Sequence, residues 1–192
     1  MSHADRDRWD ARYRARRHEP RTPDASPWLE TLAGHLPRQG RALDVAGGAG
    51  RNALWLARHG LDTTVADVSS VGLALATDRA RAEGLALSAL EIDLSASPFP
   101  AGPWDVIASF LFLQRTLFPA MAEALAPGGW LVFLQPTVTN LERHPKPPRR
   151  FLLEPGELAH ILESLPLEIV SLDESWQDGG HHEARGLARR VP

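Results

Sequence analysis

Apolar residues recur along this chain in two alternating patterns, short strand-like runs and longer helix-like segments. Strands are expected at residues 41–45, 61–67, 85–93, 104–112 and 130–136. Helical spacing follows three of these runs, at residues 51–60, 69–84 and 115–127. The alternation of strand and helix from residue 41 to 135 favours a parallel sheet that is covered by helices on both faces.

Both ends of the chain depart from this alternation. Two helices, at 4–18 and 28–36, precede the first strand and are separated by a proline-rich connection. A helix at 154–165, with Pro155 in its first turn, precedes strands at 167–176 and 181–191. The stretch QDGG joins these last strands without a helix, which predicts an antiparallel hairpin at the end of the sheet.

Local signals set several helix ends. Gly60 is expected to cap the helix at 51–60, and Gly84 lies just past the end of the helix at 69–84. Ser69 or Ser70 is expected to cap the start of that second helix. The segment 136–150 is proline-rich and basic, and it is long for a loop in a compact α/β protein.

Composition narrows the class of protein. The 192 residues suffice for one domain with a hydrophobic core, and the formal net charge of −3 favours neither nucleic acid nor anionic membrane as a partner. The chain has no cysteine, which excludes disulfides and thiolate metal sites. The opening residues are too charged for a signal peptide. We expect a soluble cytoplasmic protein, either a monomer or a small homo-oligomer.

The stretch ALDVAGGAGRNALWLA, residues 42–57, carries the strongest functional signal. An apolar strand ends in Asp44, a glycine-rich turn follows, and a helix begins. Residues 48–53 fit the dinucleotide fingerprint G-x-G-x-x-G/A, and Asp67 lies about where a ribose-binding acid is expected. A turn of this kind also binds S-adenosylmethionine, so the turn alone leaves both ligands open.

Acidic residues at the strand ends favour S-adenosylmethionine over a dinucleotide. Asp44, Asp67 and Asp93 follow or end the first three strands, so three carboxylates are expected along one rim of the sheet. A pyrophosphate would bring two negative charges to the helix start behind Asp44, and the carboxylate would repel them. A sulfonium and an ammonium group would be attracted. A cationic ligand therefore fits this rim better than a pyrophosphate.

The motifs in order resemble those of a known family. LDVAGGAGRNALWLA, VADVS, EIDL, WDVIASF and ALAPGGWLVF are similar to the successive motifs of class I S-adenosylmethionine-dependent methyltransferases. GRNALWLARHG and the early WDARY resemble the tellurite-resistance and thiopurine methyltransferase-like branch. The resemblance covers about residues 5–190. It implies a Rossmann-like, seven-stranded, mostly parallel sheet with helices on both faces and a C-terminal antiparallel hairpin, and S-adenosyl-L-methionine as cofactor.

The resemblance assigns roles by position at the methionine end of the cofactor. Asp44 would lie near the ammonium group, and Gly48 and Gly50 would let the backbone pass under the ligand. Phe110 would flank the transferred methyl group. The family's usual first glycine is here Ala46, followed by Gly47, and the methyl group of Ala46 could crowd the ligand unless its φ is negative.

At the adenosine end, the resemblance assigns four further residues. Asp67 would accept hydrogen bonds from both ribose hydroxyls, and Val68 would pack on the adenine. Asp93 would accept from the adenine amino group, with Leu94 beside it. The resulting division is a single methyltransferase domain, 1–192, with a helical cap at 1–38, a cofactor-binding core at 39–135, and a loop, helix and hairpin at 136–192.

Several residues have a functional and an ordinary interpretation. Trp9 and Tyr13, four residues apart on one helix face, could cover the cofactor or pack on the core. Asn52, with Arg51, could hold the cofactor carboxylate, or Asn52 could simply open the helix. Arg115, beside Gln114, could face substrate or solvent. The basic loop with His144, Lys146, Arg149 and Arg150 could meet an anionic substrate, although a solvated loop is the ordinary interpretation.

No metal site and no general base are assigned. His181 and His182 are adjacent, and neighbours on a strand point to opposite faces, which argues against shared zinc binding. A soft acceptor such as a thiolate or a chalcogen oxyanion needs no base. If a proton must leave, Tyr13, His144 and His181 are the candidates.

The predicted activity is methyl transfer by in-line displacement to a small-molecule acceptor, with a thiol, tellurite or selenite suspected. The residues after the fourth strand are Ser109-Phe110-Leu111-Phe112 rather than an Asn/Asp-Pro-Pro-aromatic turn, which disfavours a nucleic-acid amine as acceptor. Two alternatives remain open at this point. One is a nicotinamide-dependent oxidoreductase, and the other is a non-catalytic module that binds S-adenosylmethionine.

Overall fold

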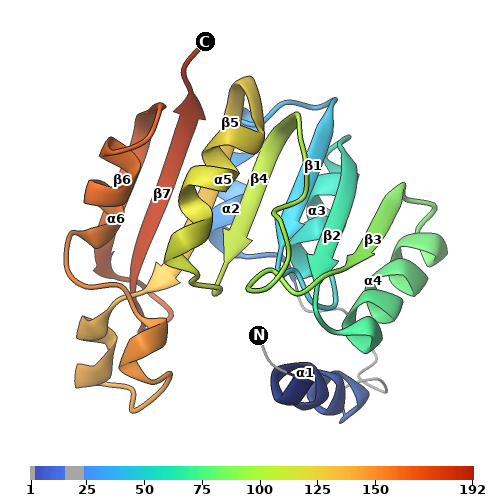
Figure 1. Ribbon diagram of the computed structural model, residues 1–192, viewed down its shortest axis with the longest axis horizontal. Coiled ribbons are helices and arrows are strands. Elements are labelled where there is room, and N and C mark those ends of the chain that lie inside the picture. Colours follow the sequence, from blue (N-terminus) through green and yellow to red (C-terminus); the bar gives the residue numbers. More distant parts are fainter. Residues whose placement is uncertain (1–2, 16–23) are drawn as a thin grey trace.

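A twisted seven-stranded sheet forms the centre of the computed structural model, which describes residues 3–15 and 24–192 (Figure 1). The strand order is β3-β2-β1-β4-β5-β7-β6. The five parallel strands are β1 (Arg41–Val45), β2 (Asp62–Asp67), β3 (Leu87–Glu91), β4 (Trp104–Phe110) and β5 (Leu125–Pro136). The hairpin strands β6 (Leu167–Trp176) and β7 (His182–Arg190) run antiparallel, with β7 beside β5. The predicted sheet is confirmed.

The sheet carries helices on both faces. The helices α2 (Pro27–Thr31), α3 (Arg51–Arg58) and α4 (Ser70–Ala82) belong to one face, and α5 (Phe118–Ala124) and α6 (Glu157–Glu163) to the other. Short 3-10 turns extend this set at η1 (Leu32–Gly34), η2 (Arg115–Leu117), η3 (Val138–Glu142) and η4 (Arg149–Phe151). The alternation has one gap, because β3 passes to β4 through turns without a helix.

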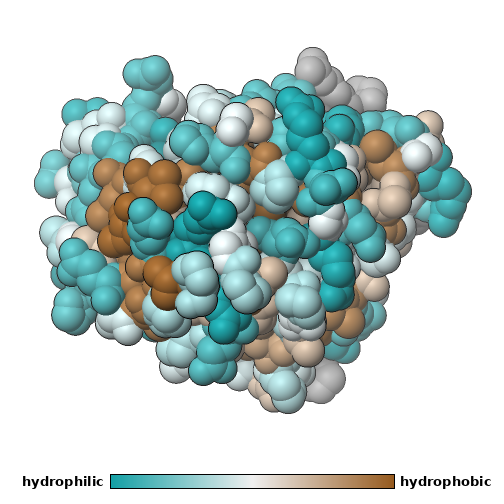
Figure 2. Space-filling model, turned by 90° about the horizontal axis from the view of Figure 1, so that it is seen from above, coloured by the Kyte–Doolittle hydropathy of each residue, from teal (hydrophilic) through white to brown (hydrophobic). Residues whose placement is uncertain are grey.

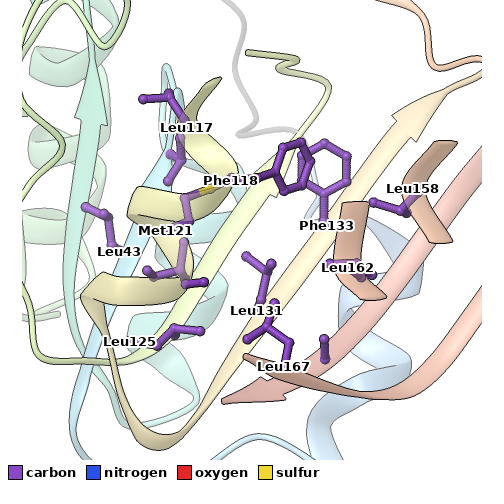
Figure 3. Packing of buried hydrophobic residues seen from close by; sticks show 14 of the residues in the cluster. Leu43, Leu117, Phe118, Met121, Leu125, Leu131, Phe133, Leu158, Leu162 and Leu167 are labelled. Atoms are coloured by element: carbon purple, nitrogen blue, oxygen red, sulfur yellow. The ribbon is translucent and has the colours of Figure 1, made fainter. Parts of the chain in front are cut away.

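Alternating side chains along the strands build two separate cores. Leu43, Ile107 and Phe133 point to the α5 and α6 face, where Phe118 and Phe133 pack with ring centroids 4.8 Å apart (Figure 3). Ala42, Val106 and Val132 point to the α2 and α3 face. Because both faces are covered, the central strands are apolar on both sides, which is typical of a parallel sheet.

Several predicted element bounds were wrong. The helix expected to reach residue 127 ends at Ala124, because Leu125 takes an extended conformation and pairs with Trp104 on β4. The helix expected from residue 154 begins at Glu157, because Gly156 takes a left-handed φ of +71°. The second predicted helix is one turn of α2 followed by η1, and the third strand ends at Glu91, two residues short of Asp93.

Helix α1 (His3–Ala15) lies apart from the sheet, below its carboxyl edge in Figure 1. The last three residues of the helix predicted at 4–18 lie outside the described residues. The Asp10 side chain of α1 is buried, and its Oδ1 accepts a hydrogen bond from Ser69 Oγ at 2.5 Å. Ser69 is the predicted N-cap of α4, and its Oγ accepts from the backbone N–H of Gly72. Asp10 thereby fastens α1 to the start of α4.

The segment between β5 and α6 lies at the same carboxyl edge, on the opposite side from α1 (Figure 1). It contains η3 and η4, and most residues from 141 to 150 are exposed. Figure 2 views the other end of the sheet, where hydrophilic residues are spread over the surface and a brown apolar patch lies on the side that carries β6 and α6. No helix within residues 3–15 and 24–192 is long and apolar enough to cross a membrane.

Candidate active site

A cavity of about 290 Å³ opens at the carboxyl edge of the sheet, between the ends of β1, β2 and β4 and helix α1. Its lining comes from the glycine turn, the strand ends and α1, and comprises Trp9, Arg12, Tyr13, Asp44, Ala46, Gly47, Ala49, Arg51, Asn52, Asp67, Val68, Arg79, Phe110, Leu111 and Phe112. Ligands of open α/β sheets bind in this crevice, where the strand order reverses between β1 and β4. Most of the predicted cofactor residues therefore meet in one cavity.

Asp44 forms the buried acidic floor of this cavity. Its side chain is 1% exposed, and Oδ2 accepts a hydrogen bond from the backbone N–H of Ala53 at 3.0 Å. Burial raises the pKa of Asp44 to about 7, and the Ala53 hydrogen bond and the charge of Arg51 offset only part of that effect. A cation placed beside this carboxyl group would favour its ionised form.

Asp67 ends β2 and faces the same cavity. Its Oδ2 accepts from the backbone N–H of Gly48 at 2.8 Å, and its Oδ1 accepts from that of Ser69 at 2.8 Å. Burial raises the pKa of Asp67 despite these hydrogen bonds. Each carboxylate oxygen keeps a further lone pair, so Asp67 can also accept from two hydroxyl groups of a ligand.

The glycine turn brings the backbone close to these side chains. A Cβ atom at Gly47 would lie 2.4 Å from Asp44 Oδ2, and one at Gly48 would lie 1.8 Å from the Tyr13 hydroxyl oxygen. Only glycine fits at either position. Ala46 precedes them with a φ of +53°, so the condition under which its Cβ would be tolerated, a negative φ, is not met.

Tyr13 and Trp9 close the cavity from the side of α1. Their rings stack with centroids 5.9 Å apart, and both line the cavity rather than the core of the sheet. Burial, followed by the charge of Asp67, raises the pKa of Tyr13 to about 12. The phenol is therefore protonated near neutral pH.

Asn52 has a structural partner besides its place in the lining. Its buried Oδ1 accepts a hydrogen bond from the backbone N–H of Ser26 at 2.9 Å, which ties the segment before α2 to the start of α3. Arg51 and Arg79 also line the cavity, and Arg79 donates to the carbonyl oxygen of Ala49. Arg79 and Asp10 carried no sequence signal, because their place depends on how α4 and α1 pack.

Four predicted cofactor residues are not part of the lining of this cavity within the described residues: Gly48, Gly50, Asp93 and Leu94. The two glycines shape the turn, and Gly50 is the N-cap of α3 with a φ of +78°. Leu94 is buried in the α5-side core, and Asp93 Oδ1 accepts from the backbone N–H and hydroxyl of Ser95. The predicted roles of Asp93 and Leu94 toward adenine stay predictions.

The structure places three predicted substrate residues away from the cavity. Arg115 forms an ion pair with Glu157 and donates to the carbonyl oxygen of Leu152, so it clamps η2 to the start of α6. Arg150 lies over the ring of Phe151 on the exposed surface. The His144 ring lies against that of His181 with centroids 4.3 Å apart and an interplanar angle of 30°, and His144 Nε2 contacts the carbonyl oxygen of Gly180.

Within the described residues, no three His, Asp or Glu side chains form a group that could hold a metal ion. His182 contacts Thr137 Oγ1 through Nδ1 at 2.7 Å, whereas His181 contacts Asn140. The two imidazole rings thus have separate hydrogen-bond partners, although the backbone N–H of His182 also donates to Asn140 Oδ1.

Comparisons with known proteins agree with this geometry. Residues 42–129 match the family model described as a methyltransferase domain. Over 103 residues the chain is 37% identical to a demethylmenaquinone methyltransferase of Thermus thermophilus, a match that spans 50% of this chain and 46% of that protein. The chain therefore spans about half the length of this curated relative.

Solved structures share the fold. TehB from Haemophilus influenzae superposes with a TM-score of 0.74 at 22% identity, over 88% of this chain and 63% of that one. The geranyl diphosphate C-methyltransferase from Streptomyces coelicolor, solved with S-adenosyl-L-homocysteine, superposes with a TM-score of 0.67 at 15% identity. The match covers 85% of this chain and 80% of that one. Over residues 42–129 the chain is therefore similar to a methyltransferase domain, and its sheet has the same fold as these solved structures.

Proposed function

We propose that this protein binds S-adenosyl-L-methionine in the cavity at the carboxyl edge and transfers its methyl group to a small-molecule acceptor. The observation that carries the proposal is the pair of buried carboxyl groups, Asp44 and Asp67, on the floor of a cavity that Arg51 also lines. A zwitterionic, cationic ligand matches this distribution of charge. A pyrophosphate, which is doubly negative, does not.

Each residue of the cavity binds a different part of the ligand. Asp44 balances the α-ammonium group, and Arg51 lies at the start of α3, where it can hold the carboxylate. Asp67 accepts from the ribose hydroxyls, and Val68 packs on the adenine. When bound, S-adenosylmethionine supplies a methyl group on a sulfonium, which the acceptor's lone pair takes in line while the electron pair of the broken C–S bond stays on sulfur.

The chain itself contributes positioning and the exclusion of water. Trp9 and Tyr13 cover the cavity from α1, and Phe110 flanks the space beside Asp44 and Ala46. Tyr13 holds its proton, so the phenol acts as a hydrogen-bonding wall rather than as a base. This arrangement suits a soft nucleophile, which needs little proton transfer. A thiol is the preferred class, and tellurite or selenite the alternative that the tellurite-resistance resemblance suggests.

The test is thermal unfolding with S-adenosylhomocysteine, with NAD, and without ligand. A ligand at 100 times its Kd adds about 2.7 kcal/mol to the free energy of unfolding, or roughly 5–10 °C in Tm for a chain of this size. We expect that shift with S-adenosylhomocysteine only, and its loss in Asp67→Ala. Asp62→Ala, at the exposed start of the same strand, is the matched control and keeps the shift.

Turnover is measured in the same preparation as formation of S-adenosylhomocysteine from S-adenosylmethionine with a thiol or with tellurite. Product with either acceptor supports the methyltransferase activity. A shift with NAD instead would favour the oxidoreductase, and cofactor binding without turnover on any acceptor would favour a non-catalytic module.

A further inference from the structure

The cavity at the carboxyl edge carries more positive charge than its acidic floor balances. Three arginine side chains, Arg12, Arg51 and Arg79, belong to its lining, together with the carboxyl groups of Asp44 and Asp67. Among the described residues, the lining holds no other charged side chain. S-adenosylmethionine would add one further positive charge, because its sulfonium and ammonium groups outnumber its carboxylate. The cavity with its proposed cofactor therefore attracts anions.

Two of these arginines already have a task. Arg51, at the start of α3, is proposed to hold the carboxylate of the cofactor. Arg79 on α4 donates to the carbonyl oxygen of Ala49, so it supports the glycine turn. Arg12 on α1 has neither task, although it lines the same cavity. The charge of Arg12 is thus available to a second ligand.

Arg12 also differs from the other arginines of its own helix. Each of those forms an ion pair with an acidic side chain: Arg6 with Glu91, Arg8 with Asp5 and Arg14 with Asp10. Within residues 3–15 and 24–192, Arg12 has no such partner, and its guanidinium lies over the Trp9 ring, 5.0 Å from the centroid. Although burial raises the pKa of Tyr13, the charge of Arg12 opposes that shift, so this charge acts on the interior of the cavity.

The mouth of the cavity combines this cation with apolar side chains. Arg12 and Leu111 line the cavity and are also exposed, Leu111 by 53%, so both lie where it opens to solvent. The half-buried rings of Trp9 and Phe112 line it as well. Leu111 has a φ of +60°, a conformation in which leucine is strained, and such strain is typical of functional segments. The mouth is therefore suited to an organic anion with an apolar body.

We propose that Arg12 determines the specificity for the methyl acceptor by recognising it as an anion, namely a thiolate that carries an apolar body. The sulfur of the acceptor bears the charge and is also the nucleophile. The apolar body packs against Trp9, Leu111 and Phe112 at the mouth. This inference rests on the proposed methyltransferase function, and it specifies the residue and the ionisation state that select the acceptor.

The transfer then balances without a base. The thiol loses its proton to solvent before it binds, because the anion is the form that Arg12 attracts. A lone pair of the thiolate sulfur forms the bond to the methyl carbon, while the methyl–sulfonium bond breaks and its electron pair stays on the cofactor's sulfur. The negative charge of the acceptor and the positive charge of the sulfonium are both lost. Arg12 no longer attracts the neutral methylated product, which favours its release.

The same features separate a thiolate from the other acceptor under consideration. Tellurite and selenite are anions as well, but they are small, strongly hydrated oxyanions without an apolar body. At the mouth they would lose hydration and gain nothing from Trp9, Leu111 and Phe112. A thiolate on an aromatic or aliphatic body matches both the cation and the apolar side chains.

The experiment measures, by calorimetry at pH 8, the affinity of the S-adenosylhomocysteine complex for three probes. They are benzenethiol, which is ionised at this pH, its neutral methylation product thioanisole, and tellurite. We expect wild type to bind benzenethiolate about fivefold more tightly than either other probe. Arg12→Gln should remove most of this preference over thioanisole. Arg8→Gln, whose guanidinium lies over the same Trp9 ring at 5.8 Å but outside the cavity lining, is the matched control and should keep it.

A second variant separates the charge of Arg12 from its shape. Arg12→Lys keeps the positive charge, so it should retain part of the preference for benzenethiolate over thioanisole that Arg12→Gln loses. The affinity for S-adenosylhomocysteine should equal that of wild type in both variants, because Arg12 is assigned to the acceptor and not to the cofactor.

Several results would overturn the inference while wild type still binds S-adenosylhomocysteine. Equal affinity of wild type for benzenethiolate and thioanisole, including no binding of either, would show that the acceptor is not recognised as an anion. An unchanged preference in Arg12→Gln, or an equal loss in Arg12→Lys or Arg8→Gln, would show that the charge of Arg12 is not the determinant.

Two further results would also overturn it. Tellurite bound as tightly as benzenethiolate would exclude a requirement for the apolar body, and weaker binding of S-adenosylhomocysteine by Arg12→Gln would assign Arg12 to the cofactor. If wild type itself fails to bind S-adenosylhomocysteine, the proposed function is refuted instead.

Discussion

At the scale of single residues, Asp44 links the electrostatics of the cavity to pH. Its pKa of about 7 in the folded chain is above the ordinary value of 3.8, because the carboxyl group is fully buried. Because folding raises the pKa of Asp44, the stabilisation that this carboxyl group contributes is fully present below about pH 4 and is lost as pH rises toward 7. Each unit of pKa difference between the folded and the unfolded chain corresponds to about 1.4 kcal/mol in the free energy of unfolding.

The first prediction concerns the ligand-free protein. Between pH 4.5 and 7.5, the difference in free energy of unfolding between Asp44→Asn and wild type should shift in favour of the variant as pH rises, because the amide does not ionise. Urea unfolding at several pH values measures this difference. A constant difference across the range would show that Asp44 has an ordinary pKa. Asp62→Asn, an exposed acid on β2, serves as the control.

Ala46 supports a second prediction at this scale. Its φ of +53° places an L-residue in the left-handed region, where glycine is free of strain. Ala46→Gly should therefore raise the free energy of unfolding by about 0.5–1 kcal/mol and leave S-adenosylhomocysteine affinity equal or tighter. Ala126→Gly, outside the turn and in extended backbone, should destabilise instead. Chemical denaturation distinguishes the two, and destabilisation by Ala46→Gly would contradict the account.

At the scale of elements, α1 covers the cavity and is attached to the start of α4 and to the glycine turn. Asp10 holds it to Ser69 and, at 3.4 Å, to the backbone N–H of Val71, while Tyr13 lies over Gly48 and Gly72. Short helices depend on such tertiary contacts for their stability. The position of α1 therefore determines how well the cavity is shielded.

The third prediction follows from this attachment. Asp10→Ala should lower the free energy of unfolding by about 1–2 kcal/mol and weaken S-adenosylhomocysteine binding, because Ser69 Oγ and the backbone N–H of Val71 lose their acceptor on α1. Hydrogen exchange should show faster exchange within α1 than in wild type. Asp7→Ala, an exposed acid on the same helix, should change neither quantity. If α1 were protected from hydrogen exchange equally in Asp10→Ala and in wild type, other contacts would be holding the helix.

Element types were predictable from the sequence more reliably than their ends. The five predicted runs became parallel strands, and the central ones place their side chains in the cores on both faces of the sheet. The QDGG turn correctly indicated the hairpin. The ends of α5 and the start of α6 were missed because long-range contacts decide them. Leu125 leaves the helix to pair with Trp104, and the backbone N–H of Gly156 donates to Glu174 on β6.

At the scale of the whole molecule, the sheet gathers residues that the sequence separates. Parallel strands place their carboxyl ends at one edge, which is why Asp44 and Asp67 could be predicted to meet. That edge lies between α1 and the segment from η3 to η4 (Figure 1). The ion pair of Arg115 with Glu157 could not be predicted, because it spans 42 residues and no local pattern signals such a partner.

The most direct test of the central claim is calorimetric titration of the wild-type protein with S-adenosylhomocysteine at pH 6 and pH 8. The buried carboxyl group of Asp44, with a pKa of about 7, must ionise to balance the ligand's ammonium group. The account therefore predicts binding at one site, with an affinity about tenfold weaker at pH 6 than at pH 8. Asp44→Asn should bind weakly and equally at both values. No heat of binding at either pH, or an affinity independent of pH in wild type, would contradict the account.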